Sequence, residues 1–278
     1  MFNRSFLRRS LRGNKVPTEA VSIIVNSYDD QRFKQFEARF LAKLDFPRVE
    51  LIRIADAASM SEGYNRAAES ATCHWLFFCH DDIGILGETS GAAFRDAMSA
   101  SDVFGPCGTQ RLVSGNWYDG GMPYNAGAVV APDPARRGEY RLELFGRSPK
   151  SLVRRVQALD GLFIACKRQV FDAIRGFDEL RLHGFHTYDI DFTFRAYLAG
   201  FDCVVTNNLL LLHDSNVSEF SEEKLAAWER ERNRFAQRFE RYLSADPGVR
   251  THDNYPLADP EDGPSARRRA VRSTRWRP

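Results

Sequence analysis

The sequence lacks the features that define several large classes of protein. No apolar run is long enough to cross a bilayer, and the first residues lack the continuous apolar core of a signal peptide. The five cysteines are scattered through apolar runs without CxxC spacing. This pattern indicates reduced thiols and disfavours both a zinc site and a disulfide framework. Together these absences predict a cytoplasmic protein.

The sequence also has little net charge. Its 39 Lys and Arg residues stand against 37 Asp and Glu residues, a net charge of +2, so we do not expect nucleic acid as a partner. The positive charge gathers at the ends, where we expect a loosely ordered basic extension over 1–19 and a disordered basic tail over 245–278. Such ends would allow peripheral contact with an anionic membrane at its inner face. The sequence does not indicate an oligomeric state.

Apolar periodicity predicts one α/β domain over residues 20–215, followed by a charged C-terminal helix over 216–244. Strands are expected at 21–25, at 49–54 and from residue 75 to the run His80-Asp81-Asp82, with helical segments between them. This alternation is typical of a parallel sheet flanked by helices. Neither GxGxxG nor a Gly-rich, Lys-containing phosphate loop follows the first strand, which disfavours a Rossmann domain and a nucleotidyltransferase.

Polar side chains follow the carboxyl end of each of these three strands. They are Asn26 and Tyr28, then Asp56, then the run His80-Asp81-Asp82. Open α/β sheets bind ligands at this edge, so we expect the three strand ends to converge on one crevice. The two adjacent carboxylates repel each other, and a divalent cation that holds a phosphate group would make the pair favourable. A polar strand end that simply starts a turn is the alternative.

Three further features carry candidate chemistry. Asp189 and Asp191 precede a predicted helix, where one carboxylate suffices as a cap and the second is surplus. His213 closes an apolar run, and its imidazole is either a structural group or a ligand for Mn²⁺. Trp117 lies in a loop rich in Gly, Asn and Pro over 108–127. Its ring either stacks on a sugar or pins the loop by being buried.

These features, in this order, resemble a GT-A glycosyltransferase of the inverting family-2 type, in the branch whose metal motif reads His-Asp-Asp. The resemblance runs from about Val21 to His213 and covers most of the chain. Its pieces are 21–25, Asp56, Tyr64-Asn65, 78–83, 160–164, 176–179, 184–192 with Arg195, and His213. It implies a mixed, mostly parallel sheet flanked by helices. It also implies transfer of a sugar from a nucleoside-diphosphate sugar, UDP-type, to a hydroxyl of a glycan, glycolipid or glycoprotein acceptor.

The resemblance also implies roles at the donor side of the site. The residues that would contact the donor nucleotide are Asn26, Tyr28, Asp56, Asn65, His80 and Asp81. Asp56 would read the base, and Asn65 would lie on a helix that lines the nucleotide pocket. Asp82 and His213 would hold a divalent metal, Mn²⁺ or Mg²⁺. His80 replaces the first aspartate of the family's DxD motif.

At the acceptor side, the resemblance implies Asp189 as the general base that removes the proton of the acceptor hydroxyl. Tyr188 stands where the family usually has a glutamate. The predicted sugar and acceptor site consists of Trp117, Asp160, Gly161, His186 and Asp191. Because His80 and Tyr188 depart from the family pattern, the alternative is a non-catalytic nucleotide-sugar or carbohydrate-binding module on the same fold.

Overall fold

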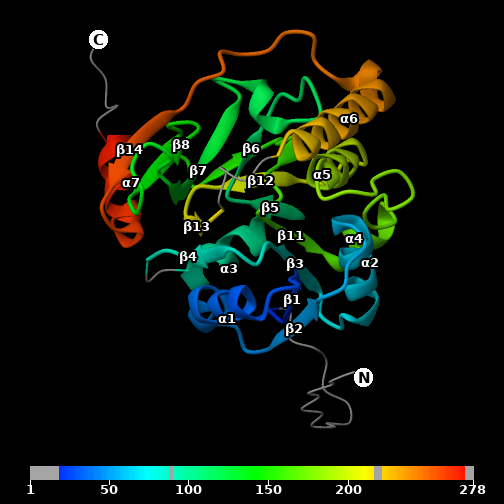
Figure 1. Cartoon of the computed structure of the whole chain (residues 1–278), viewed down its shortest axis with the longest axis horizontal. Helices are drawn as coiled ribbons and strands as arrows, with labels where there is room; N and C mark the ends of the chain where they lie inside the picture. The colour runs from blue at the N-terminus through cyan, green and yellow to red at the C-terminus, as the bar shows by residue number, and fades with distance from the viewer. Residues whose placement is uncertain (1–18, 88–89, 216–220, 273–278) are drawn as a thin grey trace.

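The alternating strands and helices at the start of the chain supply β1, β2 and β3 of a central seven-stranded sheet. Later strands complete this sheet in the order β2-β1-β3-β11-β5-β12-β9 (Figure 1). The computed structural model describes residues 19–87, 90–215 and 221–272. The strands of this sheet are β1 (Val21–Asn26), β2 (Val49–Ile54), β3 (Trp75–Cys79), β5 (Val103–Gly105), β9 (Leu152–Arg154), β11 (Phe163–Lys167) and β12 (Cys203–Thr206). Strands β1, β2 and β3 are parallel, as the sequence predicts.

Helices cover both faces of this sheet. Apolar side chains alternate between the two faces along β1, so each face needs a layer of helices to bury it. Ile23 belongs to a core cluster with Phe36 of α1, and Ile24 belongs to another with Tyr64 of α2. The helices are α1 (Asp30–Arg39), α2 (Met60–Ser70), α3 (Ser90–Ala100), α4 (Arg168–Ala173), α5 (Tyr188–Leu198), α6 (Glu222–Phe239) and α7 (Gly263–Arg272). Short 3-10 turns are η1 (Leu41–Lys43), η2 (Trp117–Gly120), η4 (Glu240–Tyr242) and η5 (Pro260–Asp262).

A second sheet, ordered β10-β6-β7-β13-β4, lies beside the first, and β8 and β14 extend it from β7. Its strands are β4 (Ile83–Ile85), β6 (Cys107–Thr109), β7 (Asn125–Pro132), β8 (Tyr140–Leu144), β10 (Ala158–Leu159), β13 (Leu211–His213) and β14 (Asp253–Leu257). Strand β13 pairs antiparallel with β4, and His213 stands opposite Ile83. This pairing brings His213 next to the end of β3.

The sheets are mixed, as expected, but they are not mostly parallel. Among the described strands, the parallel pairs are β1–β2, β1–β3, β5–β12 and β7–β13, and all the other pairs are antiparallel. The alternation that predicts a parallel sheet ends after β3. From β5 to β11 the strands follow one another without an intervening α-helix, and β6–β7, β7–β8, β6–β10 and β5–β11 pair antiparallel among them.

The expectation of a disordered C-terminal tail is wrong for the described part of that segment. Strand β14 pairs antiparallel with β8, and α7 buries Ala266 and Ala270. Arg267 donates a hydrogen bond to Asn207 Oδ1 at 2.8 Å, and burial lowers the pKa of Arg267 to about 10. Composition alone cannot reveal such long-range pairing. The basic residues of 1–18 and 273–278 lie outside the described residues, so membrane contact through them stays a prediction.

The other expectations about cysteine and membrane-spanning segments can be compared with the structure directly. All five cysteines are buried free thiols, as predicted. In the described part of the chain, every helix is too short or too polar to cross a bilayer.

Candidate active site

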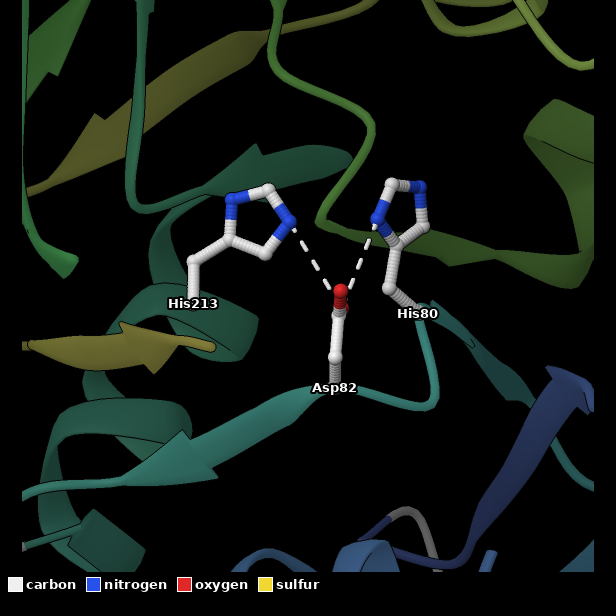
Figure 2. A group of neighbouring side chains, drawn as sticks. All are labelled: His80, Asp82 and His213. Carbon is white, nitrogen blue, oxygen red and sulfur yellow. Dashed lines mark ion pairs between the residues drawn. The ribbon is translucent and has the colours of Figure 1, made fainter. Parts of the chain in front are cut away.

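One carboxylate and two imidazoles meet at the junction of the two sheets (Figure 2). His80 follows β3, Asp82 precedes β4, and His213 ends β13. Asp82 Oδ1 lies 3.5 Å from His213 Nε2 and 3.8 Å from His80 Nδ1. Local sequence supplies His80 and Asp82, whereas the β4–β13 pairing supplies His213 from more than a hundred residues away.

This group fits a divalent cation. Its three possible ligand atoms lie within 4.8 Å of one another. Asp82 Oδ1 is buried and accepts no hydrogen bond from any described residue. A buried carboxylate oxygen without a partner is unfavourable, and a metal ion would satisfy it. Imidazole and carboxylate together suit Mn²⁺ well. The sequence prediction named Asp82 and His213 as ligands, and the structure adds His80 to the candidates.

The guanidinium group of Arg32 already neutralises part of the negative charge of the adjacent aspartates Asp81 and Asp82. Arg32 Nη2 lies 3.0 Å from Asp82 Oδ2 and 3.1 Å from Asp81 Oδ1. Ser27 donates a further hydrogen bond to Asp81 Oδ2 at 2.8 Å. Asp81 is therefore held by the protein itself, and Asp82 Oδ1 is left facing the histidines. Sequence reasoning missed Arg32, because one arginine in the first turns of a polar helix carries no distinctive signal.

Asp189 stands in the first turn of α5, where Gly161 N–H donates to its Oδ2 at 2.8 Å. Burial raises the pKa of Asp189 to about 7, and the nearby Asp160 carboxylate adds to the shift. A carboxylate with a pKa near neutrality is a suitable general base. Burial also lowers the pKa of His80 and of His186, so both imidazoles are favoured in their neutral form.

A cleft opens in front of Asp189 and gathers most of the predicted sugar and acceptor residues. Its lining consists of His80, Gly115, Asn116, Trp117, Asp160, Gly161, Phe185, His186, Thr187, Tyr188, Asp189, Ile190 and Trp228. The cleft therefore brings together residues from the ends of β3 and β10, the η2 loop and the start of α5. His80 belongs both to this lining and to the candidate metal group, so the two sites are continuous.

Trp117 contributes to the cleft mainly as a buried support. Its side chain is only 7% exposed, and its Nε1 donates to Asp160 Oδ2 at 2.8 Å. Of the two roles expected for this ring, the structure favours the one in which it pins the loop. Sequence reasoning missed Phe185, which is 53% exposed, and Trp228. An aromatic residue within a helical pattern usually belongs to the core, so nothing in the sequence marks Trp228.

Two of the predicted residues that lie outside the cleft lining, Asn65 and Asp191, are held by other parts of the protein. The side-chain amide of Asn65 forms two hydrogen bonds with the main chain of Phe177. Its Nδ2 donates to the carbonyl at 2.9 Å, and its Oδ1 accepts from the N–H at 2.8 Å. Asp191 is buried and pairs with Arg195 and Arg238. Both side chains therefore make structural contacts, and the site roles that the resemblance implies for them stay predictions.

The predicted nucleotide residues occupy neighbouring strand ends. Asn26 ends β1 opposite Ile54, the last residue of β2. Asn26 Nδ2 donates to Met60 O at 3.3 Å, whereas its Oδ1 is buried without a partner among the described residues. Tyr28 is 81% exposed, and the exposed Asp56 pairs with Arg66 at 2.9 Å. The carboxyl ends of β1 and β2 therefore lie side by side, as expected from the sequence, and Tyr28 and Asp56 beside them are exposed to solvent.

The mixed sheets flanked by helices agree with the GT-A fold that the resemblance implies. Residues 22–239 match the family described as "Glycosyltransferase like family", and the chain belongs to that family. This match covers most of the chain, including every candidate site residue named above. No curated protein sequence matches the chain.

Several solved structures resemble the chain at low sequence identity. GalNAc-T7 with UDP, GalNAc and Mn²⁺ is 13% identical, with a TM-score of 0.48 over 76% of this chain and 47% of the other. The present chain thus spans about half the length of that protein. The mannosyltransferase PcManGT from Pyrobaculum calidifontis, with GDP-Man and Mn²⁺, is 11% identical, with a TM-score of 0.49 over 91% and 70%. A Drosophila β1,4-galactosyltransferase 7 mutant with manganese, UDP-Gal and xylobiose is 11% identical, with a TM-score of 0.44 over 84% of each chain. The family assignment rests on the sequence match alone.

Proposed function

We propose that this protein is a metal-dependent inverting glycosyltransferase that moves a sugar from a nucleoside-diphosphate sugar to an acceptor hydroxyl. One observation carries the proposal. The cleft that holds Asp189, whose pKa is raised to about 7, is also lined by His80 of the candidate metal group. The proposed base and the proposed phosphate-binding centre therefore share one continuous surface, which supports a single in-line displacement.

The proposed chemistry divides between the two ends of the cleft. Asp82, His80 and His213 would hold Mn²⁺ or Mg²⁺, which when bound supplies positive charge against the departing diphosphate. Asp189 accepts the proton of the acceptor hydroxyl on the opposite face of the sugar. Gly161 N–H fixes the Asp189 carboxylate during this step. Attack and departure on opposite faces invert the anomeric centre.

The proposed donor and acceptor contacts follow from exposure and chemistry. Tyr28 and Asp56 are exposed at the strand edge next to Asn26, where they are available to a nucleoside, and a UDP-type donor is our proposal for it. Phe185 and Trp228 add aromatic surface to the cleft, against which the C–H face of a sugar packs well. The proposed acceptor is therefore the hydroxyl of a glycan, glycolipid or glycoprotein.

The test is a panel of nucleoside-diphosphate sugars with Mn²⁺, read out as released nucleoside diphosphate, together with calorimetric titration of UDP. We expect at least one donor to be turned over, and EDTA to abolish turnover. Asp82→Ala should abolish Mn²⁺-dependent UDP binding because Asp82 carries the buried, unpartnered oxygen.

The matched control is Asp133→Ala, which removes a carboxylate from a surface turn and should leave UDP binding unchanged. Full UDP binding by Asp82→Ala would contradict the metal assignment. If the wild type binds nucleotide sugars tightly but turns none over with any acceptor, the protein is the non-catalytic binding module instead.

A further inference from the structure

His80 is held at both of its ring nitrogens. Its Nδ1 lies 3.8 Å from Asp82 Oδ1, on the side of the candidate metal group. Its Nε2 lies 2.6 Å from the hydroxyl of Tyr188, on the side of the cleft. A neutral imidazole carries one proton, so the nitrogen that bears it decides whether the other can bind a metal. The contact with Tyr188 can therefore determine which ring nitrogen of His80 carries the proton and which is available to a metal ion.

The hydroxyl of Tyr188 has its own acceptor. It donates to the carbonyl of Gly161 at 3.2 Å, and its oxygen then meets His80 with a lone pair. The hydroxyl of Tyr64 also lies near the hydroxyl of Tyr188. Tyr64 donates its own proton to Cys79 O at 3.0 Å, so toward Tyr188 it can only be an acceptor. With the proton of Tyr188 used in this way, His80 Nε2 must be the donor in the 2.6 Å contact. Its Nδ1 then keeps a free lone pair.

The opposite tautomer fits the geometry less well. If Tyr188 donated to Nε2, the proton of His80 would sit on Nδ1 and point toward Asp82 Oδ1. The separation of 3.8 Å is too long for an N–H···O hydrogen bond. That arrangement would also leave Gly161 O without the Tyr188 proton. The contacts on both sides of the ring thus favour the Nε2–H form.

The surroundings of Tyr188 fix this arrangement. The side chain is 3% exposed, and its ring packs against Tyr64 and Phe177 with centroids 5.7 and 6.0 Å away. A Cβ at Gly161 would collide with the Tyr188 hydroxyl, so a glycine is required there. The N–H of the same Gly161 donates to Asp189. One glycine therefore links the histidine of the metal group to the proposed base.

We propose that Tyr188 is a positioning residue that holds His80 in the Nε2–H tautomer and so presents its Nδ1 lone pair to a divalent cation. The metal half of this inference rests on the proposed function. The tautomer half does not, because it follows from the contacts among His80, Tyr188 and Gly161 alone. Outer partners of metal-binding histidines typically change metal affinity about 10- to 100-fold.

The first experiment measures the tautomer in metal-free protein by long-range ¹H–¹⁵N correlation of the histidine side chains, with His80 assigned from His80→Gln. We expect the pattern of protonated Nε2 in the wild type and a loss or mixing of that pattern in Tyr188→Phe. A wild-type signal with protonated Nδ1 would overturn the proposal whether or not any variant folds.

The second experiment titrates Mn²⁺ alone into full-length protein by calorimetry. Tyr188→Phe should bind about 10- to 100-fold more weakly. The matched control is Tyr118→Phe, which breaks another tyrosine–histidine contact, from Tyr118 Oη to His252 Nδ1 at 2.7 Å, and should bind Mn²⁺ like the wild type. Unchanged affinity in a folded Tyr188→Phe would overturn the positioning role. A wild type that shows the Nε2–H form but binds no Mn²⁺ would overturn the metal half together with the proposed function.

Discussion

Asp189 and Asp191 stand two residues apart in the first turn of one helix, and the structure gives them different surroundings. Two residues on an α-helix point about 200° apart, so the two side chains enter different surroundings. Burial raises the pKa of both. At Asp191 the guanidinium groups of Arg195 and Arg238 oppose the shift, whereas at Asp189 the carboxylate of Asp160 adds to it. Identical carboxylates thus become a proposed base and a structural ion pair, depending only on their neighbours.

The largest expected difference between the two lies in catalysis. Asp189→Asn should lower kcat about 10²- to 10⁴-fold, because the amide cannot accept the acceptor's proton. Donor binding should persist, since Asp189 is not one of the candidate metal ligands. Asp191→Asn is the internal comparison, and its turnover per folded molecule should stay within about threefold of the wild type. Steady-state kinetics with calorimetric donor binding separates these outcomes, and comparable losses in both variants would remove the distinction drawn here.

The next largest difference lies in stability. Asp191→Ala should lower the free energy of unfolding by about 3 kcal/mol, because it removes the buried partner of Arg195 and leaves Arg238 with Asp178 alone. Urea unfolding followed by circular dichroism measures this loss. Asp202→Ala is the control, since its pair with Arg154 is solvent-exposed and should contribute less than about 1 kcal/mol. Equal losses in the two variants would show that Asp191 is not the structural carboxylate.

A smaller difference should appear in the pH dependence of stability. The pKa of Asp189 is about 7 in the folded protein against an ordinary value of 3.8, so the folded state keeps a proton that the unfolded state has lost between these values. Stability at this site is therefore lost as the pH rises through that window. Asp189→Asn should remove the loss and be more stable than the wild type at pH 8, by about 2 kcal/mol.

Urea unfolding of both proteins at pH 5 and pH 8 measures the effect. Asp191→Asn should show a smaller relative gain at the higher pH, because Arg195 and Arg238 oppose the rise in the pKa of Asp191. A wild type whose stability rises from pH 5 to pH 8 relative to Asp189→Asn would contradict the raised pKa.

Local sequence patterns predict much of the fold and the types of residue at the candidate site. The strand ends at Asn26, Asp56 and His80-Asp81-Asp82 follow from apolar runs that stop at polar residues. Ser59 and Glu62 have the spacing of a capping box, and Ser59 caps α2 by accepting the N–H of Glu62 at 3.1 Å. Such signals are readable because each depends on neighbours within a few residues. The resemblance to glycosyltransferases added roles, and the family match over 22–239 supports the assignment.

Long-range contacts decided the rest. The β4–β13 pairing places His213 beside Asp82, the β8–β14 pairing orders a segment whose composition indicates disorder, and α6 carries Trp228 to the cleft. The two positions that depart from the family pattern, His80 and Tyr188, turn out to touch each other. The sequence by itself determined which groups were available for metal binding and proton transfer. Only the tertiary structure decided which of them meet, because burial, charge neighbours and hydrogen-bond partners come from residues far apart in the chain.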